Sequence, residues 1–335
     1  MRTAYEEVRI RGRDTLVPAA RIGGHTMVAI GSWVRLAQVK DEELIEGDVI
    51  DDPRSLVELL KRSELRADVF TFAERPPRIT PRYEYHVEWD NWAVAPITTF
   101  EEWWKHRLPR ESRKNVRRAG RCGVVVRSVP FGDELVSGIA RLYNETAVRQ
   151  GRRFWHYGKD LDAVKRVNAT YLERSEFIGA FLGSELIGFV KLVYVDHIAT
   201  LMQVLAMNAQ RDKRPMNALL AHAVKACERR KLSFLVYGRY RYGSGKVTSL
   251  TEFKRRNGFE EIRFPRYYVP LNRRGKLAIR LGLHRPVRTL LPGPAREFLR
   301  GCRSQLNRVW PRRGRGPEGR GVLSEGAVRE GRSER

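Results

Sequence analysis

The spacing of apolar residues divides the N-terminal third of the chain into short strands and one amphipathic helix. The stretch "TLVPAARIGGHTMVAIGSWVRLAQV" has two β-rich runs around Gly23 and Gly24, a pattern typical of a hairpin. An Asp-Asp-Pro sequence then precedes "RSLVELLKRSEL", whose leucines fall at helical spacing and predict a capped helix. The segments "ADVFTFAE" and "YEYHVEWDNWAVAPI" follow as predicted strands, separated by a proline-rich loop.

From Thr98 the pattern becomes helical, through "TTFEEWWKHRLPRESRKNVRRAGRCG". Pro109 interrupts it, and we expect Ser112 to cap a second helix that ends near Gly120 or Gly123. One face of that helix is densely cationic, because basic side chains recur at helical spacing. They are Arg113, Lys114, Arg117, Arg118 and Arg121. Such a face is either a solvated charged surface or a binding surface for an anion such as a phosphate or a nucleic-acid backbone.

The segment from residue 130 to residue 271 has the clearest supersecondary pattern. Two predicted helices, "DELVSGIARLYNETAVRQG" and "DLDAVKRVNATYLE", precede three strands in a row: "EFIGAFLG", "LIGFVKLVYV" and "IATLMQVLAM". An amphipathic helix "PMNALLAHAVKACERRK" follows, then the strand "SFLVYGRY", a short helix that contains Lys254, and the strand "FEEIRFPRYYVPL". The predicted order is β-β-β-α-β-α-β.

Composition excludes several classes of protein. A chain of 335 residues with 42% hydrophobic and 31% charged residues is typical of a globular protein of about two domains. Three widely separated cysteines do not form a disulfide framework, and seven scattered histidines without HxH or HExxH pairs predict no metal site. No apolar run is long enough for a membrane span, and the N-terminus is not typical of a signal peptide. We therefore expect a cytoplasmic protein.

Positive charge is concentrated towards the C-terminus. Residues 271–335 contain 17 basic and 5 acidic residues, about half of the formal net charge of +25. Leucines and arginines alternate at roughly helical spacing up to Trp310, and the remaining tail is poor in apolar residues and predicted to be disordered. A basic amphipathic extension suits peripheral contact with an anionic inner membrane face, or contact with nucleic acid. The alternative is a helix pair packed on the protein, followed by a solubilising tail.

The element order over Glu176–Leu271 resembles the second half of the GNAT acyltransferase fold, and the chain resembles the FemAB-like and CelD-like branch, in which two such units occur in tandem. Four stretches carry the resemblance: "SRKNVRRAGRCGVVV", "ELIGFVKLVY", "RPMNALLAHAVKACERRKLSFLVYGR" and "FKRRNGFEE". The resemblance implies an α/β (α+β) protein with two GNAT-like units of mixed, mostly antiparallel sheet flanked by helices. The expected borders are 1–110 and 111–272 for the two units, and 273–335 for a basic helical extension and tail.

The same resemblance implies an N-acyltransferase. The donor would be a thioester, acyl-CoA or acyl carrier protein, and the acceptor an amine on a small molecule, a sugar or a lipid-linked cell-envelope precursor. The alternative is a peptidoglycan-type aminoacyltransferase that uses aminoacyl-tRNA, for which the net charge is suitable. A third interpretation, from another class, is a nucleic-acid or membrane-surface binding module without catalysis.

In GNAT proteins the donor pyrophosphate meets the N-terminus of the helix that follows the strand meander. Here that helix opens with "AQRDKRPMNALL", which lacks the glycines of the usual Q/R-x-x-G-x-G/A motif and instead resembles the FemAB-like branch. Arg211, Arg214 and Asn217 are the expected donor-binding residues on this helix. The chain therefore departs from the motif that binds coenzyme A in its usual pose.

The Phe253-Lys254 pair resembles the Phe-Lys pair of the FemAB-like family, whose lysine points into the central channel near the donor. The resemblance implies that Lys254 polarises or anchors the donor, with Phe253 beside it, since a compact ammonium can hydrogen-bond an oxyanion or a phosphate. Tyr237 and Arg239, at the end of the preceding strand, are the expected catalytic and donor-binding neighbours. The alternative is that Phe253 belongs to the core and Lys254 to the surface.

Overall fold

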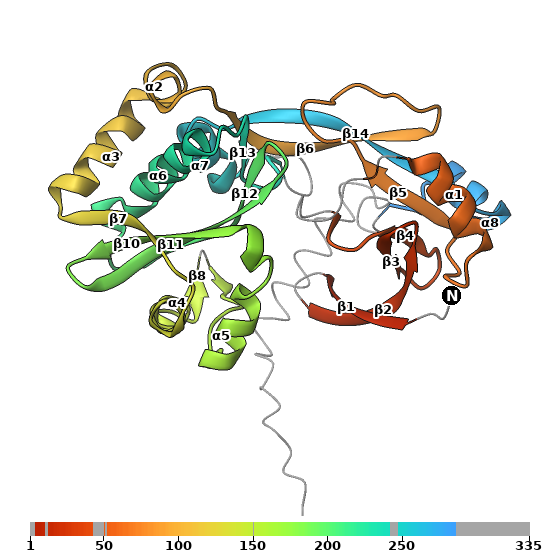
Figure 1. The fold of residues 1–335 in the computed structure, drawn as a ribbon, viewed down its shortest axis with the longest axis horizontal. Coiled ribbons are helices and arrows are strands. Elements are labelled where there is room, and N and C mark those ends of the chain that lie inside the picture. The colour runs from red at the N-terminus through yellow and green to blue at the C-terminus, as the bar shows by residue number, and fades with distance from the viewer. Residues whose placement is uncertain are drawn as a thin grey trace, which may run out of the picture. The chain divides into compact units, whose positions relative to one another are not determined.

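The computed structural model describes residues 4–10, 13–42, 50, 52–149, 151–241 and 247–285. Within these residues one sheet of twelve strands runs through the unit Met1–His284, in the order β1-β2-β3-β4-β5-β14-β6-β13-β12-β11-β10-β7 (Figure 1). Only β4 with β5 and β12 with β13 pair in parallel; the other neighbours in this sheet are antiparallel. The predicted mixed, mostly antiparallel α/β class is confirmed.

The first half of the sheet comes from the N-terminal third of the chain, as the apolar pattern predicted. Its elements are β1 (Ala4–Ile10), β2 (Arg13–Ile22), β3 (His25–Ile30), β4 (Leu36–Val39), α1 (Pro53–Arg62), β5 (Val69–Ala73) and β6 (His86–Pro96). The predicted hairpin is confirmed: Ile22 pairs with His25, and Gly23 and Gly24 both have the positive φ that favours glycine. The side chain of Asp52 accepts two backbone N–H bonds at the start of α1.

The helical pattern after Thr98 forms three elements. They are α2 (Phe100–Glu102), a π-helical turn (Trp103–Arg107) and α3 (Arg110–Arg121). The predicted cap at Ser112 is wrong, because Pro109 takes the cap position: it keeps Leu108 out of the helical region, so the preceding turn ends there and α3 begins at Arg110. Ser112 lies in the first turn instead, where its buried hydroxyl donates to the backbone carbonyl of Arg256.

The rest of the described chain contains the second half of the sheet, the strand β14 and the helix α8, which packs on β14. Its elements are β7 (Val124–Val129), α4 (Asp133–Asn144), β8 (Val148–Arg149), β9 (Arg152–Arg153), α5 (Leu161–Asn168), β10 (Ser175–Leu182), β11 (Glu185–Val195), β12 (Ile198–Ala206), α6 (Pro215–Arg229), β13 (Phe234–Val236), α7 (Ser249–Arg256), β14 (Glu260–Pro270) and α8 (Arg273–Arg280), with 3-10 turns at Leu172–Arg174 and Arg211–Lys213 and with β8 and β9 forming a separate hairpin. The predicted order β-β-β-α-β-α-β is confirmed from β10 to β14.

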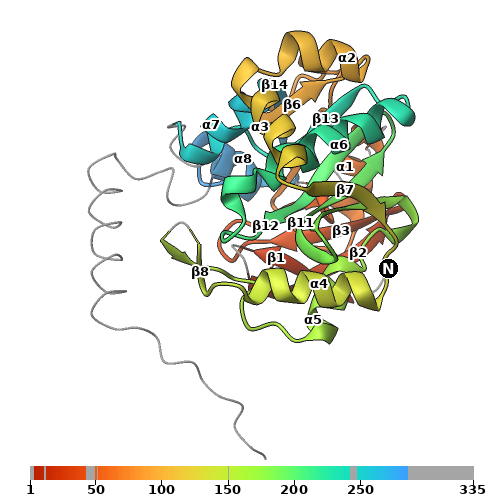
Figure 2. The same cartoon turned by 90° about the vertical axis from the view of Figure 1, so that its left-hand side faces the viewer.

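Helices cover both faces of the β10–β11–β12 meander. α6 packs on one face with α3 against it, and α4 packs on the other face with α5 against it, as Figure 2 shows. Because both faces are covered, β11 is buried almost throughout, which explains its nearly continuous apolar sequence "LIGFVKLVYV". The core on the α6 side includes Ile178, Val190 and Leu220, and the core on the α4 side includes Ile139 and Phe189.

The last strand of the sheet joins its two halves. Along β14, residues Glu260–Tyr268 pair with β6 and Arg266–Pro270 pair with β5, so the strand bridges elements far apart in sequence (Figure 1). The two predicted units therefore share one continuous sheet. Of the predicted extension 273–335, the described part contains helix α8; the rest, from residue 286, lies outside the described residues. None of the described helices combines the length and apolar character that crossing a bilayer requires.

Candidate active site

A cleft opens where β12 and β13 separate. The two strands pair only from Ile198 with Phe234 to Thr200 with Val236, and β12 then continues to Ala206 while β13 ends. The prediction of a strand through Tyr240 is therefore wrong. Beyond Val236 the chain follows β6: the N–H of Tyr237 donates to the carbonyl of Ala93, and the carbonyl of Gly238 accepts the Ala93 N–H, both at 2.8 Å.

The cleft has a volume of about 900 Å³, within the range of small-molecule and cofactor sites. Its walls come from β12 and the loop after it, the first turn of α6, the end of β13, α7 and the start of α3. The lining residues are Ser112, Asn115, Arg149, Val204, Leu205, Ala206, Met207, Asn208, Arg211, Arg214, Pro215, Met216, Asn217, Tyr237, Ser249, Leu250, Glu252, Phe253, Arg256 and Asn257. Five residues predicted from the sequence thus share one cleft: Tyr237, Arg211, Arg214, Asn217 and Phe253.

The first turn of α6 presents positive charge to the cleft. Arg214 precedes the helix in the left-handed conformation, with φ 59°, and Pro215 occupies the first helical position. Both Arg211 and Arg214 line the cleft, and the Nε atom of Arg214 is shielded from water without a hydrogen-bond partner among the described residues. A buried N–H donor without a partner is costly, so an anion in this cleft would satisfy it.

Asn217, which lines the same cleft, connects the start of α6 to the end of α7. Its Nδ2 atom donates to Oδ1 of Asn257 at 2.8 Å, and the Asn257 amide in turn donates to the carbonyl of Phe253 at 2.8 Å. Both asparagine side chains are buried. This bond, together with that from Ser112 of α3, ties the start of α6 and the start of α3 to the end of α7. The prediction that Asn217 binds the donor stays a prediction.

Lys254 is fully enclosed, with 0% of its surface exposed, so the alternative of a surface lysine is wrong. Its Nζ atom donates to the backbone carbonyl of Arg239 at 2.6 Å and lies 4.6 Å from the centre of the Tyr237 ring. Burial lowers its pKa from 10.5 to about 8, because removal from water disfavours the charged form. Tyr237 lines the cleft whereas Lys254 is absent from its lining and lies against the Tyr237 ring. The predicted role of Lys254 towards the donor stays a prediction.

Arg239 contributes its backbone rather than its side chain to this arrangement. Its guanidinium forms an ion pair with Asp90 at 3.0 Å, and Asp90 also lies 3.4 Å from the Nε atom of Arg266. Arg266 is buried and pairs with Glu42 at 3.1 Å. A chain of alternating charges thus links the first half of the sheet to the carbonyl that holds Lys254. Arg239 is absent from the cleft lining, and its donor-binding role stays a prediction.

Glu145 and Arg149 were missed from the sequence. The carboxylate of Glu145 accepts the N–H groups of Asn208 and Ala209, both at 2.9 Å, directly after β12. Arg149 forms an ion pair with Glu145 at 2.7 Å and donates to the carbonyl of Ala206 at 2.9 Å. The backbone N–H groups that follow β12 are therefore already hydrogen-bonded, to the carboxylate of Glu145. The Glu145–Arg149 pair is local, but no local pattern could reveal the bonds to the loop, because Glu145 and Asn208 are 63 residues apart and Arg149 and Ala206 are 57 apart.

The cationic face of α3 divides into two groups. Arg113 donates to the carbonyls of Trp104 and Lys105 at 2.9 and 2.6 Å, and the Arg117 guanidinium lies 5.7 Å from the centre of the Trp104 ring. These two side chains fasten α3 to the preceding helical turn. Lys114 lies 3.8 Å from Glu111 on an exposed surface, while Arg118 and Arg121 are exposed without an ion pair to any described residue. The predicted anion contact stays a prediction.

Comparisons with protein-family models and with curated protein sequences find no match to this chain. Solved structures do match. A structure of FemX has a TM-score of 0.56 at 12% identity and covers 84% of this chain and 90% of its own. L-PGS from Bacillus licheniformis has a TM-score of 0.50 at 12% identity and covers 77% of this chain and 85% of its own. At such identities the likeness concerns the fold, and the fold expected from the resemblance to the FemAB-like branch of GNAT proteins is confirmed.

Proposed function

We propose that this protein is an acyltransferase that moves an acyl group to an amine, with the donor bound in the cleft between β12 and β13. One arrangement carries the proposal. The parallel strands β12 and β13 stop pairing after three residues, Arg211 and Arg214 line the cleft at the start of α6, and the buried Lys254 lies against Tyr237 of the cleft wall. Acyl transfer needs the donor carbonyl to be held and polarised and the acceptor amine to be placed in line. This cleft supplies both an enclosed volume and fixed positive charge.

We further propose a thioester donor, either acyl-CoA or an acyl carrier protein. Arg211 and Arg214 at the start of α6 are positioned to bind donor phosphate, since guanidinium groups suit phosphate oxygens. Because Glu145 occupies the amides after β12 and the loop lacks glycine, side chains rather than loop amides would bind the phosphate. Tyr237 lines the cleft, and its hydroxyl is our candidate for a hydrogen bond to the reacting groups.

A second donor, aminoacyl-tRNA, is favoured by one specific observation. Arg118 and Arg121 stay exposed on α3, and Asn115 of the same helix lines the cleft. A nucleic acid could therefore contact the helix while its acylated end enters the cleft. Binding of tRNA would weaken steeply as salt rises, whereas a nucleotide-sized thioester would give a shallow dependence. A protein that only binds nucleic acid would show the steep dependence without any transfer.

The experiment is a thermal-shift and native mass spectrometry series against coenzyme A, a panel of acyl-CoAs and bulk tRNA, each at low and moderate salt. A ligand of the folded state raises the melting temperature by mass action. We expect an acyl-CoA to stabilise the protein, Arg214→Ala to remove most of that shift, and Arg118→Ala, outside the cleft, to retain it. Salt-sensitive stabilisation by tRNA alone would replace the thioester with the aminoacyl donor. If none of these ligands binds, acyl-CoA and aminoacyl-tRNA are both excluded as donors, and an acyl carrier protein donor or a role without catalysis takes their place.

A further inference from the structure

A second group of side chains, all with atoms that can bind a metal ion, lies at the opposite end of β6 from the cleft. His86 and Glu88 are two positions apart on β6, so both side chains leave the same face of the strand. His284, nearly two hundred residues later in the chain, joins them. Each of the three side chains offers one ligand atom, and these atoms lie within 4.8 Å of one another. We propose that His86, Glu88 and His284 form a binding site for a divalent transition-metal ion of the zinc type.

The fold brings His284 to this place through α8. Gly275 of α8 lies so close to Asp68, at the start of β5, that a Cβ atom there would collide with the Asp68 carbonyl. After α8 the chain turns back tightly, with Gly282 at φ 70° and the Leu283 N–H donating to the Ala278 carbonyl at 2.8 Å. Local geometry therefore determines the position of His284, whose side chain is 0% exposed.

The distances are close to those of a metal centre. Zinc bonds of about 2.0–2.2 Å at tetrahedral angles place ligand atoms about 3.3–3.6 Å apart. The Nε2 atom of His86 lies 3.5 Å from Oε1 of Glu88, which already matches. The Nε2 atom of His284 lies 2.6 Å from the same oxygen, where a hydrogen bond places a proton between the two atoms. Replacing that proton by a metal ion requires the pair, now 2.6 Å apart, to open by about 0.7–1.0 Å.

The ligand atoms of these three side chains determine which kind of metal ion the site would bind. Calcium and magnesium prefer oxygen ligands throughout, whereas two imidazoles with one carboxylate suit zinc and its neighbours in the periodic table. Three protein ligands also leave a fourth position open, as in catalytic zinc sites. His86 and Glu88 are 39% and 25% exposed at their side chains, so solvent and ions can reach the site from outside.

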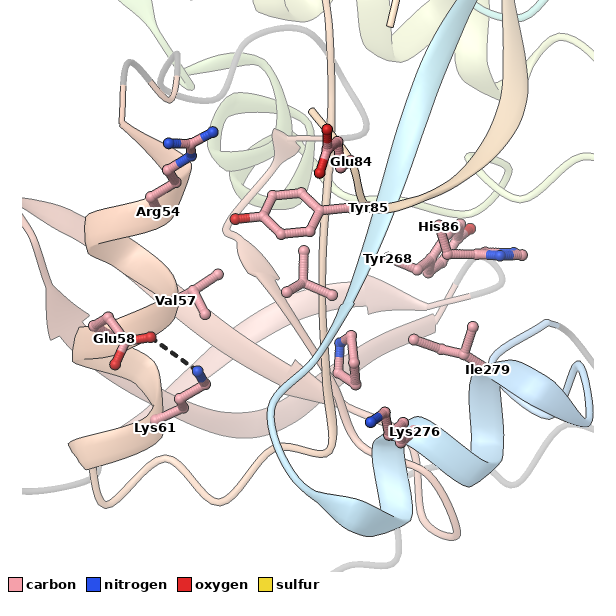
Figure 3. A pocket seen from close by; sticks show the side chains of 12 residues that line it. Arg54, Val57, Glu58, Lys61, Glu84, Tyr85, His86, Tyr268, Lys276 and Ile279 are labelled. Carbon is pink, nitrogen blue, oxygen red and sulfur yellow. Dashed lines mark hydrogen bonds and ion pairs between the residues drawn. The ribbon is translucent and has the colours of Figure 1, made fainter. Parts of the chain in front are cut away.

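One of the three residues, His86, also lines a second cleft, whereas Glu88 and His284 are absent from the lining of that cleft. His86 and Tyr268 line a groove of about 620 Å³ that also includes Tyr85 and residues of α1 and α8 (Figure 3). Tyr268 pairs with His86 across the β6–β14 ladder, and its ring centre lies 4.5 Å from that of His284. Lys276 of α8 lines the same groove. The proposed ion would therefore lie beside this groove, next to the one ligand that lines it, His86.

The test uses full-length protein prepared without a polyhistidine tag, treated with a chelator and titrated calorimetrically with zinc chloride. Cobalt chloride serves as a second, spectroscopic probe, since its absorption reports coordination by nitrogen ligands. We expect about one ion per chain and a loss of affinity of at least about 100-fold in Glu88→Gln and His284→Ala, because removing a ligand should exceed the 10–100-fold effect of outer-shell changes. Zinc should also raise the melting temperature of the wild type.

The matched control is His106→Ala. His106 is an exposed histidine that lies 3.7 Å from the carboxylate of Glu102, so it tests whether any histidine beside an acid binds the ion. If His284→Ala does not fold, as circular dichroism would show, the more exposed His86→Ala and the Glu88→Gln variant decide the matter. The proposal is overturned if the chelator-treated wild type takes up no ion, or if the ligand variants bind it as the wild type does.

Discussion

The enclosed ammonium of Lys254 should make the stability of this protein depend on alkaline pH in a way that one substitution removes. The pKa of Lys254 falls from 10.5 to about 8 on folding, because burial disfavours its charge. Between these two values the unfolded chain binds more protons than the native one, so the free energy of unfolding must rise with pH. Below pH 8 the lysine is charged in both states, and the native protein bears the full cost of burying the charge.

The size of the effect follows from the two pKa values. For a single site with values of about 8 and 10.5, the free energy of unfolding rises by roughly 1.4 kcal/mol between pH 7 and pH 9 and by roughly 2.5 kcal/mol by pH 10. Lys254→Met keeps a similar shape and cannot titrate. The difference between wild type and variant therefore isolates this group, since all other titrating residues contribute equally to both proteins.

The assay is urea unfolding followed by tryptophan fluorescence at pH 7, 8, 9 and 10. Lys114→Met, at an exposed position, is the control and should give a flat difference from the wild type. A flat difference for Lys254→Met as well would refute the reasoning, because it would mean that the lysine titrates alike in the folded and unfolded chain. The same variant should lose acyl transfer if the charge behind Tyr237 contributes to the reaction.

Three further predictions concern the cleft and its surroundings. Glu145→Gln should lower the free energy of unfolding by about 1–3 kcal/mol, because charge-assisted bonds to the loop after β12 are weakened, and should speed hydrogen exchange of that loop. Asn217→Ala should cost about 1–3 kcal/mol in chemical denaturation, since it leaves the buried amide oxygen of Asn257 without its donor; unchanged stability would contradict the described bond. Arg113→Ala should lower the melting temperature, whereas Arg118→Ala should leave it unchanged and only reduce the salt dependence of any nucleic-acid binding.

The sequence determined the order and kind of most elements, because apolar periodicity and turn chemistry act over a few residues. The meander β10–β11–β12, the helix α6 and the hairpin at Gly23 and Gly24 could all be predicted in this way. The short helix predicted around Lys254 is also present, as α7. The place where α3 begins was misjudged by a few residues, because both a proline and a serine offered local signals and the proline determined the start.

Only the tertiary structure decided how far β13 follows β12 and which groups meet across long sequence separations. Over Phe234–Val236, β13 pairs with both β6 and β12. Beyond Val236 the chain keeps its bonds to β6 while β12 continues without it, and this opens the cleft. Glu145 reaches the loop after β12, and His284 reaches Glu88, only because the intervening elements fold back on the sheet. Such contacts depend on the packing of whole helices and strands, so no pattern within a short stretch of sequence contains them.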